Sequence, residues 1–143
     1  MVIQAGKGRT ALTYDVRLFG SDLLISVFGG VAHIGSVAVG DCGSLLSYTA
    51  KEHKDDALSE TLAKTISRRY QCRCVVTAGF HLDDIVKEEI SAVLETHVEG
   101  SKKVMAALDE LLESSESKDI LYNGKKICLT APGFWPIIIV NKK

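Results

Sequence analysis

The sequence has neither a charge excess nor a long apolar run, and both absences exclude classes of protein. Its 17 Lys and Arg residues face 18 Asp and Glu residues, which gives a formal net charge of −1 at pH 7. A chain so near neutrality lacks the basic surface that binds nucleic acids or anionic lipids, so we expect neither partner. No apolar run approaches the roughly 20 residues of a membrane-spanning helix. Residues 1–10 contain no apolar signal core, so we expect a cytoplasmic protein.

Cysteine is scarce and lacks the spacing of a structural zinc site. The sequence contains Cys42, Cys72, Cys74 and Cys128, and no two of them form a C-x-x-C pair. A zinc ribbon needs two such knuckles, so this class is excluded. We interpret the four cysteines as small apolar side chains in a reducing compartment.

The first half of the sequence predicts strands. After a polar lead-in over residues 1–10, apolar and polar residues alternate near 12–18, 23–28, 34–39 and 44–50, with glycine-containing turns between them. Alternation with a period of two is typical of half-buried strands, and the short turns favour a meander of antiparallel hairpins.

The second half has mainly helical spacing. We expect a helix over about 55–70, a strand over 72–78, a helix from Asp83 or Asp84 to Gly100, and a third helix ending before a polar loop at 114–117. Together with 46% hydrophobic and 24% charged residues, this predicts a single domain over residues 1–143. The predicted fold class is α/β (α+β): a mixed, initially antiparallel sheet with two to three helices packed on one face.

The C-terminal part, from about residue 114, has a different character. Asn123-Gly124 between two apolar stretches predicts a two-residue hairpin. The apolar tail around Trp135 is interpreted as a final strand or as a contact between subunits. We therefore expect a homo-oligomer.

Three of the four histidines are predicted to lie at one edge of the sheet. His33 precedes the strand near 34–39, His53 follows the strand near 44–50, and His81 follows the strand near 72–78. A crossover helix makes the last strand parallel to the strand near 44–50, so both end at the same edge. The strand near 23–28 also ends there. The edge is then shared by Gly29, Gly30, Lys54, Asp55, Asp83 and Asp84.

Such an edge supports three kinds of chemistry. Neutral imidazoles can bind a transition metal, with Asp83 or Asp84 as a further ligand or as an orienting group. Glycine backbone and helix N–H groups can hold a phosphate, helped by Lys54 or a protonated histidine. A histidine can act as a general acid or base. Capping or surface histidines are the structural alternative. His97, placed near a helix C-terminus, is assigned no function.

The same residues resemble a known family. Residues 29–38 read GGVAHIGSVA and resemble the GGxxPHIGAVA stretch of the LpdD-like family, the prenylated flavin chaperone domain. Residues 52–56, EHKDD, are similar to the family's GHKED, and residues 78–83, AGFHLD, are similar to its GIHVD. The three blocks occur in the family's order and span roughly residues 10–112.

The resemblance implies a cofactor chaperone rather than an enzyme. It suggests that the protein binds prenylated FMN or FMN, with a divalent transition metal as a further candidate ligand. The partners implied are a UbiD-type non-oxidative decarboxylase and a flavin prenyltransferase. The expected cofactor-binding residues are Gly29, Gly30, His33, Gly35, Ser36, His53, Lys54, His81 and Asp83, and the expected metal ligands are His33, His53 and His81. No catalytic residue is expected.

Two alternatives use the same sequence features differently. A small metal-dependent hydrolase or lyase would use the three histidines to activate water at an open metal position. A structural subunit would dock through the segment around Trp135 and would not need the histidines.

Overall fold

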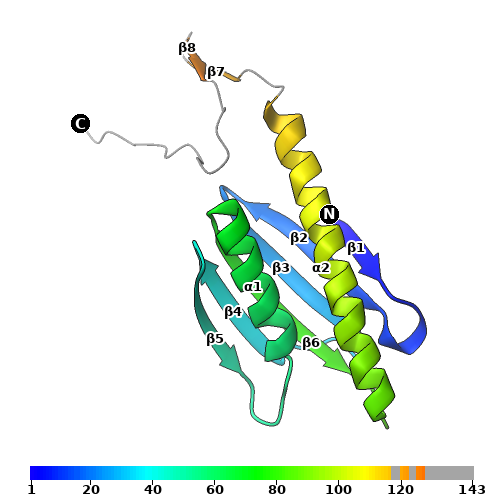
Figure 1. Ribbon diagram of the computed structural model, residues 1–143. Coiled ribbons are helices and arrows are strands. Elements are labelled where there is room, and N and C mark those ends of the chain that lie inside the picture. Colours follow the sequence, from blue (N-terminus) through cyan, green and yellow to red (C-terminus); the bar gives the residue numbers. More distant parts are fainter. Residues whose placement is uncertain (117–119, 123–124, 128–143) are drawn as a thin grey trace.

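The computed structural model describes residues 1–116, 120–122 and 125–127, with side chains up to Glu113 (Figure 1). In chain order the elements are β1 (Val2–Ala5), a 3-10 turn (Gly8–Thr10), β2 (Leu12–Phe19), β3 (Asp22–Gly30), β4 (Ser36–Asp41), β5 (Ser44–Thr49), α1 (Asp56–Tyr70), β6 (Arg73–His81), α2 (Lys87–Glu116), β7 (Ile120–Tyr122) and β8 (Lys125–Ile127).

The main sheet is mixed and has six strands in the order β1-β2-β3-β6-β4-β5. β6 is parallel to β3 and antiparallel to β4, while the pairs β1–β2, β2–β3 and β4–β5 are antiparallel. The expected uninterrupted meander is therefore wrong, because β6 inserts between β3 and β4. The fold class and the direction of β6 relative to β5 are as predicted. The insertion buries the most apolar strands in the middle of the sheet, where both edges are paired.

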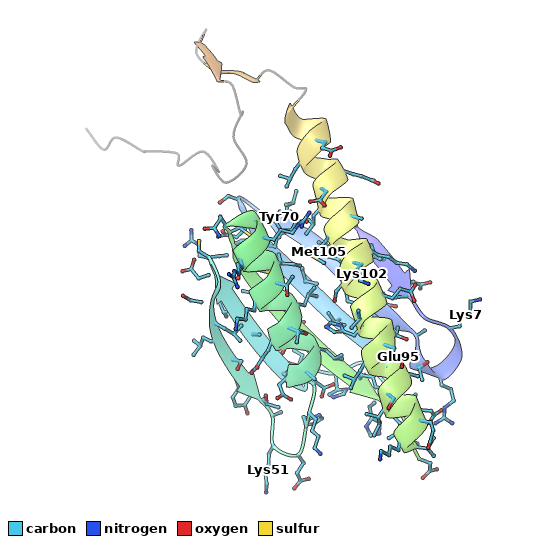
Figure 2. All side chains as sticks on the ribbon, viewed as in Figure 1. Lys7, Lys51, Tyr70, Glu95, Lys102 and Met105 are labelled. Carbon is cyan, nitrogen blue, oxygen red and sulfur yellow. The ribbon has the colours of Figure 1, made fainter. Side chains whose placement is uncertain are left out.

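Both helices pack on one face of the sheet and cover its apolar core (Figure 1). α1 contributes Leu58, Leu62 and Ile66 to this core, a spacing of four that places one apolar stripe against β4 and β6. The Tyr70 hydroxyl donates to the Met105 carbonyl oxygen at 2.9 Å, which ties the end of α1 to α2 (Figure 2).

Two sequence predictions about the chain's elements are corrected. Residues 2–5 of the supposed polar lead-in form strand β1, which pairs with β2. The two helices expected on either side of Gly100 are one helix of 30 residues, which also includes part of the predicted loop at 114–117. Gly100 continues this helix because it packs against the buried ring of Tyr14, where a Cβ atom would collide with the phenol.

His97 lies in the middle of α2 and not near a helix C-terminus, as the sequence had suggested. It is only 5% exposed, and its ring lies between the hydroxyls of Tyr14 and Thr61, at 3.0 and 3.1 Å. Thr61 already donates to the Ala57 carbonyl, so its oxygen accepts from His97 Nε2–H, and Nδ1 accepts from Tyr14. Both ring nitrogens of His97 are therefore hydrogen-bonded, and the neutral ring is part of the core.

The C-terminal hairpin pairs β7 with β8, with Tyr122 opposite Lys125. This register agrees with a two-residue connection, although Asn123-Gly124 itself and the tail around Trp135 lie outside the described residues. None of the helices in the described ranges is long and apolar enough to span a membrane.

Candidate functional site

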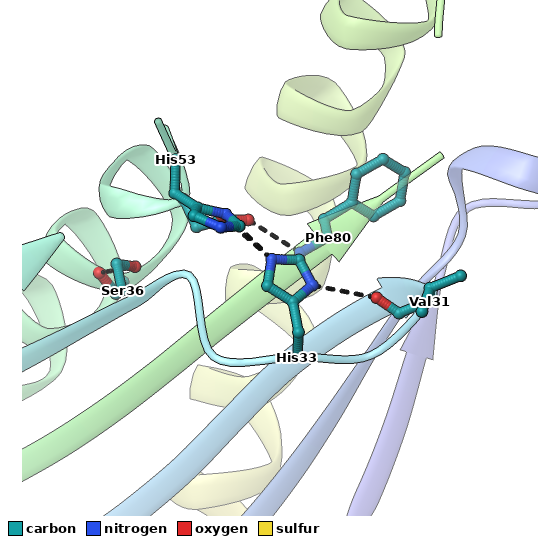
Figure 3. A network of polar contacts seen from close by, with 7 residues as sticks. Val31, His33, Ser36, His53 and Phe80 are labelled. Atoms are coloured by element: carbon teal, nitrogen blue, oxygen red, sulfur yellow. Dashed lines mark hydrogen bonds and ion pairs between the residues drawn. The ribbon is translucent and has the colours of Figure 1, made fainter. Parts of the chain in front are cut away.

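The rings of His33 and His53 meet at the edge of the sheet where β3, β5 and β6 end. His33 lies in the connection from β3 to β4, and His53 lies in the connection from β5 to α1. Their ring centroids are 4.8 Å apart, and His33 Nε2 is 3.1 Å from His53 Nδ1 (Figure 3). The strand directions thus bring together two side chains that are 20 residues apart in the sequence.

A buried carboxylate completes this cluster. Asp55, the residue before α1, is 7% exposed, and its Oδ2 lies 3.2 Å from His53 Nδ1 and 3.7 Å from His33 Nε2. Its other oxygen, Oδ1, accepts a hydrogen bond of 2.8 Å from the backbone N–H of Phe80 on β6. A helix start and a strand end therefore fix the carboxylate between them. We call His33, His53 and Asp55 the rim cluster.

Hydrogen bonding sets the tautomers of the rim cluster. His33 Nδ1 is 3.0 Å from the carbonyl oxygen of Val31, which can only accept, so Nδ1 carries the proton. In neutral His33 the lone pair is then on Nε2 and points at His53 Nδ1 and the Asp55 carboxylate. The lone pairs of His33 Nε2 and the Asp55 carboxylate would repel a lone pair on His53 Nδ1. Either a proton on His53 Nδ1 or a metal ion in its place removes this repulsion.

The donor set fits a transition-metal ion. One ligand atom from each residue of the rim cluster lies within 4.8 Å of the others. Two imidazole nitrogens and one carboxylate oxygen are the ligand types that first-row transition metals accept, with positions left open for another ligand. The hydrogen bond from His33 Nδ1 to a carbonyl is the outer contact that metal-ligating histidines usually make.

Close backbone packing holds the cluster in place. A Cβ atom on Gly35 would collide with the Asp55 carboxylate, and one on Gly79 would collide with the His33 carbonyl oxygen. Gly30 has a positive φ of 60°, and a Cβ there would meet the His81 carbonyl oxygen. These glycines let the loops approach β6 closely, which is a packing role distinct from the ligand contact expected for Gly30 and Gly35.

His81 stands beside the rim cluster rather than in it. Its ring is edge-on to that of His33 with centroids 6.3 Å apart, and its Nε2 lies 3.2 Å from Asp83 Oδ1. The imidazole of His81 is 55% exposed. The structure therefore groups two of the expected metal ligands with Asp55 and leaves the third facing Asp83.

The remaining expected site residues differ in their distance from the edge and in their exposure. Gly29 lies in β3 next to Phe80, and Lys54 is exposed in the same connection as His53. Ser36 is fully buried and its hydroxyl lies 2.8 Å from that of Ser59, so it faces α1 and does not reach the edge (Figure 3). Ser36 thus connects β4 to α1, and its expected contact with a cofactor stays a prediction.

Sequence reasoning did not select Asp55 as a ligand. Its position two residues after His53 and directly before a helix indicated a helix start, and that role alone explained an acidic residue. In the structure its side chain makes no capping hydrogen bond to α1 and turns instead to Phe80 and the histidines. The one feature of the sequence that could have indicated a ligand role for Asp55 is its position two residues after His53.

Comparison with known proteins identifies the family of the chain. Residues 6–109 match the family described as the prenylated flavin chaperone LpdD-like domain. The chain is 34% identical over 112 residues to the protein LpdD of Lactiplantibacillus plantarum, a match that covers 73% of this chain and 80% of that protein.

A solved structure shares the fold. A chain in the crystal structure of a novel chaperone complex for yeast 20S proteasome assembly aligns with a TM-score of 0.52 and 16% identity, covering 78% of this chain and 97% of that one. At this identity the similarity concerns the fold alone. The family match and the relative are decisive: the chain belongs to the prenylated flavin chaperone LpdD-like family.

Proposed function

We propose that the protein binds prenylated FMN, or a related flavin, at the edge of the sheet around the rim cluster and delivers it as a chaperone. The clients would be a UbiD-type non-oxidative decarboxylase, which uses the cofactor, and a flavin prenyltransferase, which makes it. Family membership supports the chaperone role. The observation that carries the location is the convergence of His33, His53 and Asp55.

The charges at this edge favour a metal ion as part of the ligand site. Asp55 is buried in the cluster, and Asp83, Asp84 and Glu52 are exposed nearby in the same connections. These four carboxylates outnumber the ammonium groups of Lys51 and Lys54 in the same connections, so an anionic flavin phosphate would meet net negative charge here. A divalent cation on the rim cluster would reverse that sign and would retain open positions for an anionic group.

The surroundings also offer apolar surface and backbone donors. Val31 and Ile34 flank His33 and are 63% and 66% exposed, which suits contact with an aromatic ring system. α1 begins directly after Asp55, so its positive end faces the same edge. When bound, the prenylated flavin would supply electrophilic chemistry to the decarboxylase, whereas this chain's residues bind and shield it.

The test is anaerobic titration of the purified protein with reduced prenylated FMN, followed by calorimetry and by absorbance from about 300 to 600 nm. We expect stoichiometric binding in the presence of Mn²⁺ or Zn²⁺, and at least about 10-fold weaker binding after chelation, because removing the cation leaves the acidic edge. The variant H33A should behave like the chelated protein. The variant K64A on the outer face of α1 serves as the control.

A metal-dependent enzyme is the second candidate, because two histidines and a carboxylate with open positions are also a catalytic ligand set. Stoichiometric metal without any affinity for prenylated FMN or FMN, together with hydrolysis of a small ester or phosphoester substrate, would replace the chaperone proposal with this one.

A further inference from the structure

The face of the main sheet opposite α1 and α2 is not covered by any element among residues 1–116 (Figure 1). We call it the open face. Side chains alternate between the two faces along each strand, and the buried residues of β2, β3, β4 and β6, apart from Gly79, point toward the helices. The intervening residues therefore point away from the helices, to the open face.

The open face is rich in apolar side chains from all six strands. Exposed members are Val2 (67%), Phe19 (78%), Leu24 (38%), Leu46 (73%) and Tyr48 (68%). The half-buried members are Phe28, Val37, Val39 and Val75. The strand registers make Leu24, Val75, Val39 and Leu46 direct neighbours across β3, β6, β4 and β5, and Val37 and Tyr48 lie beside them. A contiguous apolar stripe of this kind on an exposed face marks an interaction site.

The sequence of the central strands supports this. In β4 the open-face residues Val37 and Val39 alternate with buried Ser36 and Ala38, so the more apolar side chains point outward. In β6, Val75 and Val76 are apolar on both faces. Strands that stay exposed on one face usually carry polar residues there, whereas strands covered on both faces do not.

Most charges on the open face are paired within the chain. Arg17 Nη2 lies 2.6 Å from Asp15 Oδ2, and Arg73 Nε lies 3.4 Å from Asp22 Oδ2. Asp41, opposite Arg73 at the end of β4, is the remaining carboxylate of the open face, so the face keeps only a small negative charge at one end. A second copy of the same surface therefore meets little like-charge repulsion.

We propose that the open face is the interface with a second copy of this chain, packed sheet against sheet. Six strands about 4.8 Å apart, with on average about seven residues of about 3.3 Å each, give a flat footprint of roughly 670 Å² per copy. Two such footprints exceed the lower limit of about 1,200 Å² that stable interfaces bury. Identical sheets stack in this way about a two-fold axis.

The interface extends to the rim cluster. Gly79 lies in β6 two residues after Thr77 and faces the same side as Val75, and its missing Cβ leaves room for the His33 carbonyl. The loop that carries His33 thus crosses the end of the open face. A second copy covering this face lies next to the imidazoles, although the interface argument does not depend on what they bind.

The oligomeric state of the full chain, measured by sedimentation equilibrium over a dilution series, tests the proposal. We expect a dimer whose dissociation constant increases at least about 100-fold in L24K and in V39K, because each places two like charges in an apolar interface. The matched control is L94K on α2, where Leu94 is 45% exposed and belongs to the exposed stripe Ile90, Leu94 and Val98. L94K should remain dimeric.

A monomer at every concentration, or dissociation by L94K but not by L24K and V39K, would overturn the proposal. If the lysine variants fail to fold by circular dichroism, hydroxyl-radical footprinting of the unmodified protein decides. Oxidation of Tyr48 should then increase on dilution while that of Leu94 stays constant. Tyr48 protection that does not change on dilution would assign the cover to the chain's own residues beyond 127 and refute the second copy.

Discussion

The buried imidazole of His97 predicts a loss of stability in mild acid. Burial lowers the pKa of His97 from 6.5 to about 4, since the ring is sealed between β2, α1 and α2. Its two partners, Tyr14 and Thr61, are uncharged hydroxyls, so neither would compensate a positive charge on the ring. Protonation of Nδ1 would also displace the hydrogen bond that Tyr14 donates to it.

The magnitude follows from the two pKa values. As the pH falls below 6.5 the unfolded chain takes up the proton first, so the contribution of His97 is complete above that pH and is lost toward pH 4. Between pH 7.5 and pH 5 the free energy of unfolding should fall by about 2 kcal/mol from this residue alone. That is a large fraction of the 5–15 kcal/mol typical of a domain.

Urea denaturation of the metal-free protein at pH 7.5, 6.5, 5.5 and 5.0 measures the effect, with the H97Q variant in parallel. Glutamine remains neutral, so the pH-dependent difference between the two proteins isolates His97 from the carboxylates. The variant's own packing defect adds an offset that does not vary with pH. Parallel curves for the two proteins would show that His97 is not the titrating group and would refute the reasoning.

Three further predictions concern the cluster and its support. D55N should weaken Zn²⁺ binding at least about 10-fold by calorimetry and H81A by less than about 3-fold, because only Asp55 lies within the ligand set. G35A should destabilise the protein by about 1–3 kcal/mol in urea, because its Cβ meets the Asp55 carboxylate. S36A should cost about 1–3 kcal/mol by leaving the Ser59 hydroxyl buried without that partner, while metal affinity stays unchanged.

Opposite results would be equally informative. A larger effect of H81A than of D55N would restore the three-histidine set that the sequence suggested. A loss of metal affinity in S36A at constant stability would return Ser36 to the ligand site.

Elements with a local residue pattern could be predicted from the sequence alone. The period of two in residues 12–18 and 23–28, and the four-residue spacing in residues 58–66, follow from one-sided burial, so β2, β3 and α1 were predicted nearly to their ends. Strand directions follow from the type of connection, because a hairpin makes the next strand antiparallel and a crossover helix makes it parallel. For this reason the meeting of His33, His53 and His81 at one edge was also predictable.

The order of the strands in the sheet and the contacts between distant side chains could not be predicted in this way. The insertion of β6 between β3 and β4 depends on long-range pairing, which no local pattern encodes. Gly100 continues α2 because a distant tyrosine ring occupies the space of a side chain, which overrides its poor helix propensity. Asp55 joins the histidines because a backbone N–H of β6, 25 residues away, draws its carboxylate from the helix start. Each outcome is a contact between distant segments, and such contacts are set by packing rather than by sequence periodicity.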